Sequence, residues 1–292
     1  MLNYLLLLIP VLFLQPCFGQ KKIDVTYIAN AGFLIESNSK KVLIDCLFNT
    51  GWNSYLIPSD SVISRIISLQ APFNNANLLL ITHNHPDHFN DSLVVEYLNN
   101  NSENILIAPT LVTTAILKNQ AFKNRNQVVD LDKINRQNND TTINGIRIRS
   151  FFILHDSRPQ IEHVGFLIDI GDIKVFHSGD SNGSDSIEFE KLQLQKEQVD
   201  LAFLNFYGFW NTKEERLFTE KYILPKKISL IHIPQNEFKS VMDSVKLIRD
   251  FIDITLFDGS MDKKSFLYES SNQFNAKNNC LSFGMYTLKY LK

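Results

Sequence analysis

Three histidines and one aspartate fall within six residues of the chain, at His83, His85, Asp87 and His88. Imidazole and carboxylate groups are the usual protein ligands of Zn²⁺, and Fe and Mn accept the same donors. The whole chain has 7 histidines, so a chance cluster of this kind is a weak alternative. The cluster predicts a transition-metal site, and four donors this close together can serve two adjacent ions.

The local sequence explains how these donors can face one cavity. An apolar run, Leu78–Thr82, precedes them and predicts a buried strand. Residues two apart in an extended chain point the same way, so His83 and His85 can hold one ion together. Pro86 then favours a new turn, which carries the last two donors to another side of the strand end.

The rest of the chain alternates short β-rich runs with amphipathic segments, which predicts an α+β protein with two packed sheets and helices outside. Strands are predicted over Ile23–Ile28, Gly32–Glu36, Lys41–Asp45, Leu78–Thr82, Asn104–Ala108, Gly145–Leu154, Val164–Ile170, Ile173–His177, Leu201–Phe206 and Ser229–Ile233. Helices are predicted over Ser61–Leu69, Ser92–Asn99, Leu111–Lys118, Ser186–Lys196 and Phe238–Phe251.

One hairpin pattern occurs twice. Gly32–Glu36 followed by Lys41–Asp45 returns as Gly165–Asp169 followed by Lys174–His177. Two unrelated β-hairpins that happen to look alike are one interpretation. The other is a duplicated β-rich half, in which each copy supplies loops to a shared central cleft.

Several segments resemble the metallo-β-lactamase superfamily. His83-Asn84-His85-Pro86-Asp87-His88 is similar to its HxHxDH signature, and Thr26–Glu36 with Lys41–Asp45 is similar to its opening hairpins. Phe176–Asp180 resembles the strand that ends in Gly-Asp, and Ile231–Pro234 resembles the segment with the last histidine. The resemblance covers nearly all of the mature chain, and it implies a four-layer αββα sandwich with metals at one edge.

The resemblance also implies the cofactors and the site. It implies two divalent ions, Zn²⁺ in the first place with Mn or Fe as alternatives, and a hydroxide between them as the nucleophile. Asp87 is expected to act in catalysis as well as to bind metal. The implied ligands are His83, His85 and His155 for one ion, Asp87, His88 and His232 for the other, and Asp180 between the two.

Two further histidines compete for roles around this site. His155 follows the predicted strand Gly145–Leu154, where the chain opens into a polar loop, and is therefore our candidate for the missing ligand. His163 starts the next strand and is expected to support a ligand or to be a bystander. A packing or supporting role is expected for His177. The aromatic run Asn205–Trp210 either lines a substrate cleft or marks the passage from core to loop.

Length, charge and the N-terminus set the remaining expectations. The chain has 292 residues, 44% of them hydrophobic, and a net charge of −2 without a basic stripe, so nucleic-acid binding is not expected.

Residues 1–19 are predicted to be a signal peptide, with Cys17 and Gly19 before the cleavage site, and residues 20–292 are predicted to form a single hydrolase domain. The protein is therefore expected to be periplasmic or secreted, with membrane contact only if this segment is retained as an anchor. Cys46 is expected to be a small buried apolar residue.

The leading hypothesis is an exported dinuclear hydrolase that acts on a small-molecule ester, lactone or phosphodiester. The compact Ala31–Ile35 opening and the His177–Asp180 segment resemble the lactonase-like and phospholipase D-like branch of the superfamily. A β-lactamase and a metal-containing binding protein without turnover are the alternatives. An intact ligand set argues against the second alternative, and the oligomeric state is left open.

Overall fold

A computed structural model describes residues 20–52, 54–132, 139–156, 158–183, 185–248 and 253–269. The chain divides into two compact units, residues 22–266 and a second unit formed by 1–21 with 267–292. All described residues except 20, 21 and 267–269 belong to the first unit. The predicted signal peptide lies outside the described residues. None of the helices in the described part of the chain combines the length and apolar character needed to cross a bilayer.

The first sheet has seven strands in the order β14-β1-β2-β3-β4-β5-β6. Its first three strands in sequence form an antiparallel meander, and β4 to β6 then add in parallel. The strands are β1 (Gln20–Ala29), β2 (Gly32–Ser37), β3 (Lys40–Ile44), β4 (Leu78–Leu80), β5 (Ile105–Pro109), β6 (Val128–Leu131) and β14 (Lys263–Glu269).

The second sheet also has seven strands, in the order β13-β12-β11-β10-β9-β8-β7. Strands β7 to β10 are antiparallel to their neighbours, and β11 to β13 add in parallel. The strands are β7 (Asp140–Ile143), β8 (Ile146–Phe152), β9 (Val164–Ile170), β10 (Ile173–His177), β11 (Leu201–Asn205), β12 (Lys227–Ile231) and β13 (Asp253–Thr255).

The repeated hairpin pattern marks two halves with the same strand order. Strands β1 to β6 are paired antiparallel, antiparallel, parallel, parallel, parallel, and β8 to β13 repeat this series. The repeated segments are strands β2 with β3 and β9 with β10, which pair as hairpins in both halves. The interpretation as a duplicated β-rich half therefore agrees with the topology, and each half contributes strand ends to one cavity.

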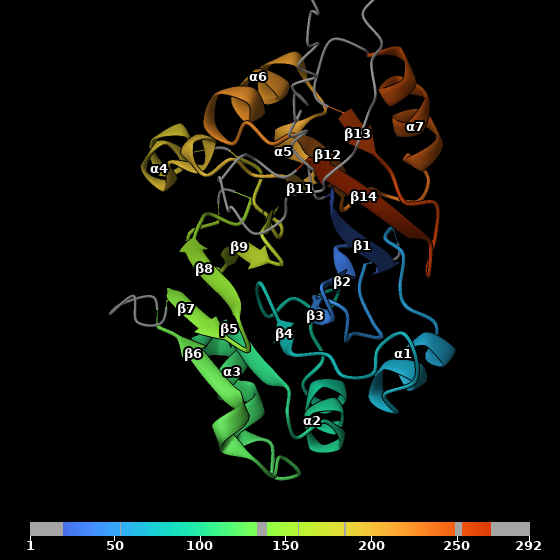
Figure 1. Cartoon of the computed structure of the whole chain (residues 1–292), viewed down its shortest axis with the longest axis vertical. Helices are drawn as coiled ribbons and strands as arrows, with labels where there is room; N and C mark the ends of the chain where they lie inside the picture. Colours follow the sequence, from blue (N-terminus) through green and yellow to red (C-terminus); the bar gives the residue numbers. More distant parts are fainter. Residues whose placement is uncertain are drawn as a thin grey trace, which may run out of the picture. The chain divides into compact units, whose positions relative to one another are not determined.

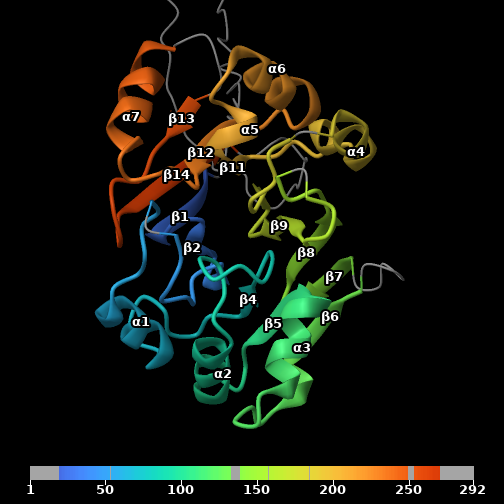
Figure 2. The same cartoon turned by 180° about the vertical axis from the view of Figure 1, so that it is seen from behind.

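The two sheets pack face to face, and the helices cover their outer faces (Figures 1 and 2). Phe33 of β2 contacts Phe203 of β11 between the sheets, with ring centroids 4.3 Å apart. Helices α1 (Asp60–Ile67), α2 (Asp91–Asn100) and α3 (Thr110–Lys118) share a buried apolar cluster with the first sheet. The second sheet shares another buried apolar cluster with four helices, α4 (Ser186–Leu192), α5 (Phe206–Phe209), α6 (Lys213–Tyr222) and α7 (Phe238–Leu247). This confirms the predicted α+β sandwich.

The predicted elements differ from the observed ones in three ways. Gln193 has a left-handed φ of 55° and separates α4 from a short 3-10 helix, Leu194–Lys196, so the single helix predicted over Ser186–Lys196 was wrong. The last helix ends at Leu247, and the predicted end at Phe251 lies outside the described residues. Strands β6, β7, β13 and β14 and helices α5 and α6 were not predicted, because short or polar segments carry little periodicity.

Candidate metal centre

The signature segment forms the turn that Pro86 favours. Strand β4 ends at Leu80, and two residues, Ile81 and Thr82, separate it from His83. The backbone N–H groups of His88 and Phe89 both donate to the carbonyl of His85, at 3.1 and 3.0 Å. This tight turn reverses the chain, so that the donors before and after Pro86 face the same space.

A first group of potential ligands consists of His83, His85, His155 and Asp180, whose ligand atoms lie within 4.8 Å of one another. Asp180 Oδ2 lies 3.8 Å from His83 Nε2 and 3.5 Å from His155 Nε2. His155 follows the end of β8, as predicted, and its backbone bridges to Ser181 beside Asp180. The four side chains thus come from three strand ends, those of β4, β8 and β10, which are far apart in sequence.

A second group consists of Asp87, His88, His232 and again Asp180, all buried and within the same 4.8 Å limit. His88 Nε2 lies 3.1 Å from Asp180 Oδ1, and His232 Nε2 lies 2.9 Å from Asp180 Oδ2. His232 follows β12 and has a left-handed φ of 56°, a strained conformation that is common at functional sites. Asp180 is the residue shared by both groups, which is the place predicted for a bridging carboxylate.

The donor atoms of these groups fit metal ions because the protein leaves them without partners. The Nε2 atoms of His83, His88, His155 and His232 are buried and make no hydrogen bond within the described residues, and the same holds for one oxygen each of Asp87 and Asp180. Buried polar atoms are normally satisfied, and a cluster of unsatisfied ones indicates a missing ligand. The structure therefore brings together all seven predicted side chains in an arrangement that suits cations.

Asp45 fixes the orientation of two of these histidines. Its Oδ2 accepts a hydrogen bond from Nδ1 of His88 at 2.8 Å and another from the Thr82 hydroxyl at 2.7 Å. The Thr82 hydroxyl in turn accepts from Nδ1 of His83 at 2.9 Å. Since Nδ1 of each ring is engaged in these hydrogen bonds, Nε2 is the nitrogen that faces Asp180. Sequence reasoning missed this role, although Asp45 ends a predicted strand at the same edge.

His163 supports the site from behind. Its Nε2 accepts a hydrogen bond from the backbone N–H of Asp180 at 2.9 Å, and its Nδ1 donates to the carbonyl of Ile153 at 3.1 Å. Gly179 has a φ of +54°, and a Cβ there would lie 2.4 Å from His163 Nε2, so only glycine permits this contact. His163 thus links the strand end before His155 to the turn that carries Asp180.

His177 and Asn30 are two more buried polar supports. His177 Nε2 donates to the carbonyl of Ala31, and its Nδ1 accepts from the N–H of Gly179, so the ring fixes the Gly-Asp turn without facing the cluster. The Asn30 amide donates to Asp87 Oδ2 at 3.0 Å. A supporting role was predicted for His177, whereas Asn30 was missed.

The pKa values of His83 and His85 are shifted in the opposite direction from those of His88 and His232. Burial lowers the pKa of His83 well below its usual range and lowers the pKa of His85 to about 4. Burial opposes protonation of His232 as well, yet the neighbouring Asp180 carboxylate outweighs it and raises the pKa of His232 to about 9. The pKa of His88 is likewise raised well above its usual range. Cations that bind His88 and His232 must therefore displace protons, whereas His83 and His85 already offer neutral imidazole.

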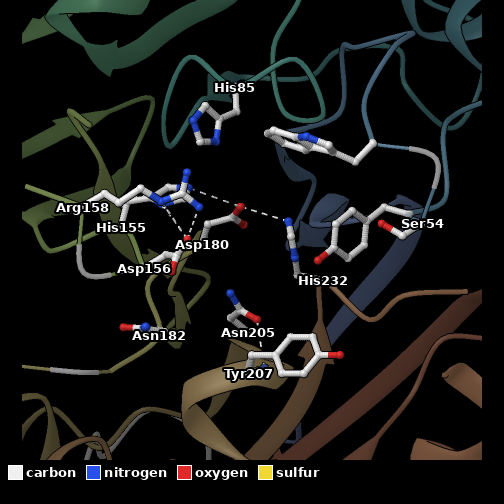
Figure 3. Close-up of a pocket in the computed structure, with 12 residues that line it drawn as sticks. Ser54, His85, His155, Asp156, Arg158, Asp180, Asn182, Asn205, Tyr207 and His232 are labelled. Atoms are coloured by element: carbon white, nitrogen blue, oxygen red, sulfur yellow. Dashed lines mark hydrogen bonds and ion pairs between the residues drawn. The ribbon is translucent and has the colours of Figure 1, made fainter. Parts of the chain in front are cut away.

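The cluster lies at the floor of an open cavity of about 440 Å³ (Figure 3). Figure 3 shows Asp180 between His155 and His232, with Arg158 on the His155 side and Tyr207 below. The run Asn205–Trp210 contributes to both the cavity and the core. Asn205 and Tyr207 line the cavity. The buried apolar cluster of the second sheet contains Phe206, Phe209 and Trp210. The cavity is lined by Trp52, Ser54, Tyr55, His85, His155, Asp156, Arg158, Asp180, Asn182, Asn205, Tyr207 and His232.

Trp52, Tyr55, Arg158 and Asn182 were missed as cavity residues. Each lies in a loop that follows a strand end of the same edge, and that position is the signal that could have found them. The Trp52 ring contacts the His85 ring edge-on, with centroids 5.3 Å apart, and the Tyr55 ring lies 4.0 Å from the His232 ring. One loop thus contacts one histidine of each group.

Two face-to-face sheets, outer helices and a His/Asp cluster at one edge define a protein of the metallo-β-lactamase fold. Residues 40–250, more than half of the chain, match the family model described as the beta-lactamase superfamily domain. The protein belongs to this superfamily. A curated relative, a metal-dependent hydrolase from Thermococcus kodakarensis, is 23% identical over 218 residues, which cover 72% of this chain and 84% of the relative.

Solved structures share the fold at low sequence identity. The metallo-beta-lactamase fold protein YhfI from Bacillus subtilis superposes with a TM-score of 0.56 and 15% identity, covering 86% of this chain and 100% of YhfI. CmlA, a diiron beta-hydroxylase from Streptomyces venezuelae, gives a TM-score of 0.54 and 13% identity, covering 84% of this chain and 54% of CmlA. The fold alone therefore does not select the reaction, which has to come from the site.

Proposed function

We propose that this protein is a dinuclear metal-dependent hydrolase of a small-molecule ester, lactone or phosphodiester. The observation that carries the proposal is the convergence of six ligand-competent side chains on a seventh, Asp180, each with a buried donor atom that has no hydrogen-bond partner among the described residues. The T. kodakarensis relative, a metal-dependent hydrolase, supports the reaction class. The first ion would be held by His83, His85, His155 and Asp180, and the second by Asp87, His88, Asp180 and His232.

When bound, a pair of divalent ions supplies Lewis-acid activation and a hydroxide nucleophile near neutral pH. The chain's own residues would hold the two ions in place and compensate their positive charge. Asp180 is shared by both ligand groups, so its negative charge would offset the repulsion between two cations. Asp87, which Asn30 holds at 3.0 Å, adds a second carboxylate beside His232 and is the proposed acid–base residue.

The cavity supports a small substrate in preference to a polymer. A volume of about 440 Å³ lies in the range of small-molecule sites, and the net charge of −2 provides no attraction for nucleic acid. The aromatic rings of Trp52 and Tyr55 and the guanidinium of Arg158 stand on the cavity wall. An apolar or flat part of a substrate can pack against the rings while a polar part reaches Arg158, which suits the lactonase-like and phospholipase D-like branch.

The experiment combines metal analysis with a substrate screen. Purified protein reconstituted with Zn²⁺, Mn²⁺ or Fe should retain about two ions per chain. It should hydrolyse members of an ester, lactone or phosphodiester panel, and a chelator should abolish the activity. One ion or none would contradict the dinuclear site. Turnover of β-lactams alone would favour the β-lactamase, and two bound ions with no turnover would favour a binding protein.

We further propose that the protein is exported after cleavage before Gln20. This rests on the apolar run in residues 1–19 and on the small residues Cys17 and Gly19. Mass spectrometry of the protein isolated from its native cells should show an N-terminus at or near Gln20. An intact Met1 would reject cleavage and favour a retained anchor.

A further inference from the structure

Two tyrosines line the cavity, and they differ in what their hydroxyl groups do. The Tyr207 hydroxyl donates to Glu237 Oε1 at 2.6 Å and points away from Asp180 in Figure 3. For the Tyr55 hydroxyl, the described residues provide no hydrogen-bond acceptor, although its ring stands against His232 at the floor of the cavity. One phenol is thus engaged by the protein, and the other is available to a substrate.

The position of Tyr55 is fixed by the segment that carries His232. The backbone N–H of Gln235 donates to the carbonyl of Ser54 at 2.7 Å, and the Gln235 side-chain amide donates to the carbonyl of Tyr55 at 2.9 Å. Gly51, earlier in the same loop, lies so close to Asp87 that a Cβ there would be 2.8 Å from the Asp87 Cβ. The loop therefore packs against two of the three segments that supply the second ligand group, the one with Asp87 and His88 and the one with His232.

We propose that the Tyr55 hydroxyl is a catalytic hydrogen-bond donor, which binds the substrate oxygen that gains negative charge as the ester, lactone or phosphodiester bond breaks. This rests on the proposed function. A phenol is protonated at neutral pH and donates one hydrogen bond, and it keeps its proton here, so no bond at Tyr55 forms or breaks. A donor already in place when the charge develops stabilises the transition state more than the ground state.

The test uses Tyr55→Phe, which removes the hydroxyl and keeps the ring on His232. The best substrate from the panel should show a kcat reduced about 10- to 100-fold, with a KM within about threefold of wild type. Metal analysis should still find about two ions, because Tyr55 is not a ligand. An unchanged kcat, or loss of an ion, would overturn the proposal.

A second measurement does not depend on turnover. Inorganic phosphate carries charged oxygens, and calorimetry of the metal-loaded protein should show that Tyr55→Phe weakens phosphate binding about tenfold. Tyr207→Phe is the matched control, because its hydroxyl is bonded to Glu237, and it should change phosphate binding less than twofold. Equal effects of the two substitutions, or no phosphate binding to wild type, would reject the role of Tyr55. Failure of the proposed function appears separately, as wild-type protein without two ions or without turnover.

Discussion

Oδ2 of Asp45 accepts a hydrogen bond from Nδ1 of His88 at 2.8 Å, and both side chains are fully buried. Asp45→Asn should therefore weaken the second metal site about 10- to 100-fold, because the amide no longer matches the donors of His88 and Thr82. Competition with a chromophoric chelator measures this affinity. Asp140→Asn, in an exposed ion pair with Arg147, is the control and should leave metal affinity unchanged. Wild-type affinity in Asp45→Asn would contradict this positioning role.

Asp180 is shared by both ligand groups, so Asp180→Asn should weaken both ions together. The neutral amide no longer offsets two positive charges at a site where Asp180 reaches His88 at 3.1 Å and His232 at 2.9 Å. Metal analysis after dialysis against graded chelator should show a joint loss. Loss of a single ion, with the other still tightly held, would be incompatible with a bridging carboxylate.

His155 and His163 separate a ligand from a support. His155→Ala should abolish tight binding at the first site, because its Nε2 lies 3.5 Å from Asp180 and has no other partner among the described residues. His163→Ala should leave both ions bound, since both ring nitrogens are already bonded to the backbone of Ile153 and Asp180. The metal content of the two variants decides the assignment, and the reverse result would exchange their roles.

Removal of the metals should destabilise the fold. Buried donor atoms without partners disfavour the folded state, and a cation that binds only this state stabilises it by about 2.7 kcal/mol per site at a concentration 100 times its Kd. Thermal unfolding with excess Zn²⁺ and with chelator should differ by several degrees in Tm. Equal Tm values would show that the cluster does not bind this cation in the folded state.

Glu197 provides a pH-dependent contribution far from the metal centre. Hydrogen bonds from the Arg149 guanidinium at 2.7 and 2.6 Å, and then from Lys174, lower the pKa of Glu197 from 4.5 to about 2, against the effect of burial. Because the folded pKa is the lower one, the stabilisation is complete above about pH 4.5 and is lost as the pH falls towards 2.

Glu197→Gln should therefore lower the free energy of unfolding by about 1 kcal/mol at pH 7 and by less than half of that near pH 3. Denaturant unfolding at the two pH values measures the difference. Asp253→Asn, in an exposed ion pair with Lys227, is the control. It should change the free energy of unfolding by no more than a few tenths of a kcal/mol at either pH. A Glu197→Gln effect that is constant with pH would exclude an electrostatic origin.

Local pattern was sufficient for most of the fold. Strands β9 and β10 have the predicted bounds, Val164–Ile170 and Ile173–His177, since their apolar runs are framed by the turn at Gly171 and Asp172. The same holds for the turn at Pro86, because proline restricts its neighbour whatever surrounds it. Segments whose conformation depends on distant contacts were missed, such as α5, which begins at the Asn205 cap and includes Gly208 at a φ of 99°.

The sequence by itself determined the chemistry of the donors, because three histidines and an aspartate in six residues have few other uses, and the family pattern added His155, Asp180 and His232. Only the tertiary structure decided which atoms face one another. Asp45 and His232 reach the site in left-handed conformations, with φ of 44° and 56°, that no local pattern predicts. Tyr55 and Arg158 reach the cavity on loops from different halves of the chain. Such positions are set by the packing of two sheets, whose contacts join residues far apart in sequence, and not by the spacing of residues along the chain.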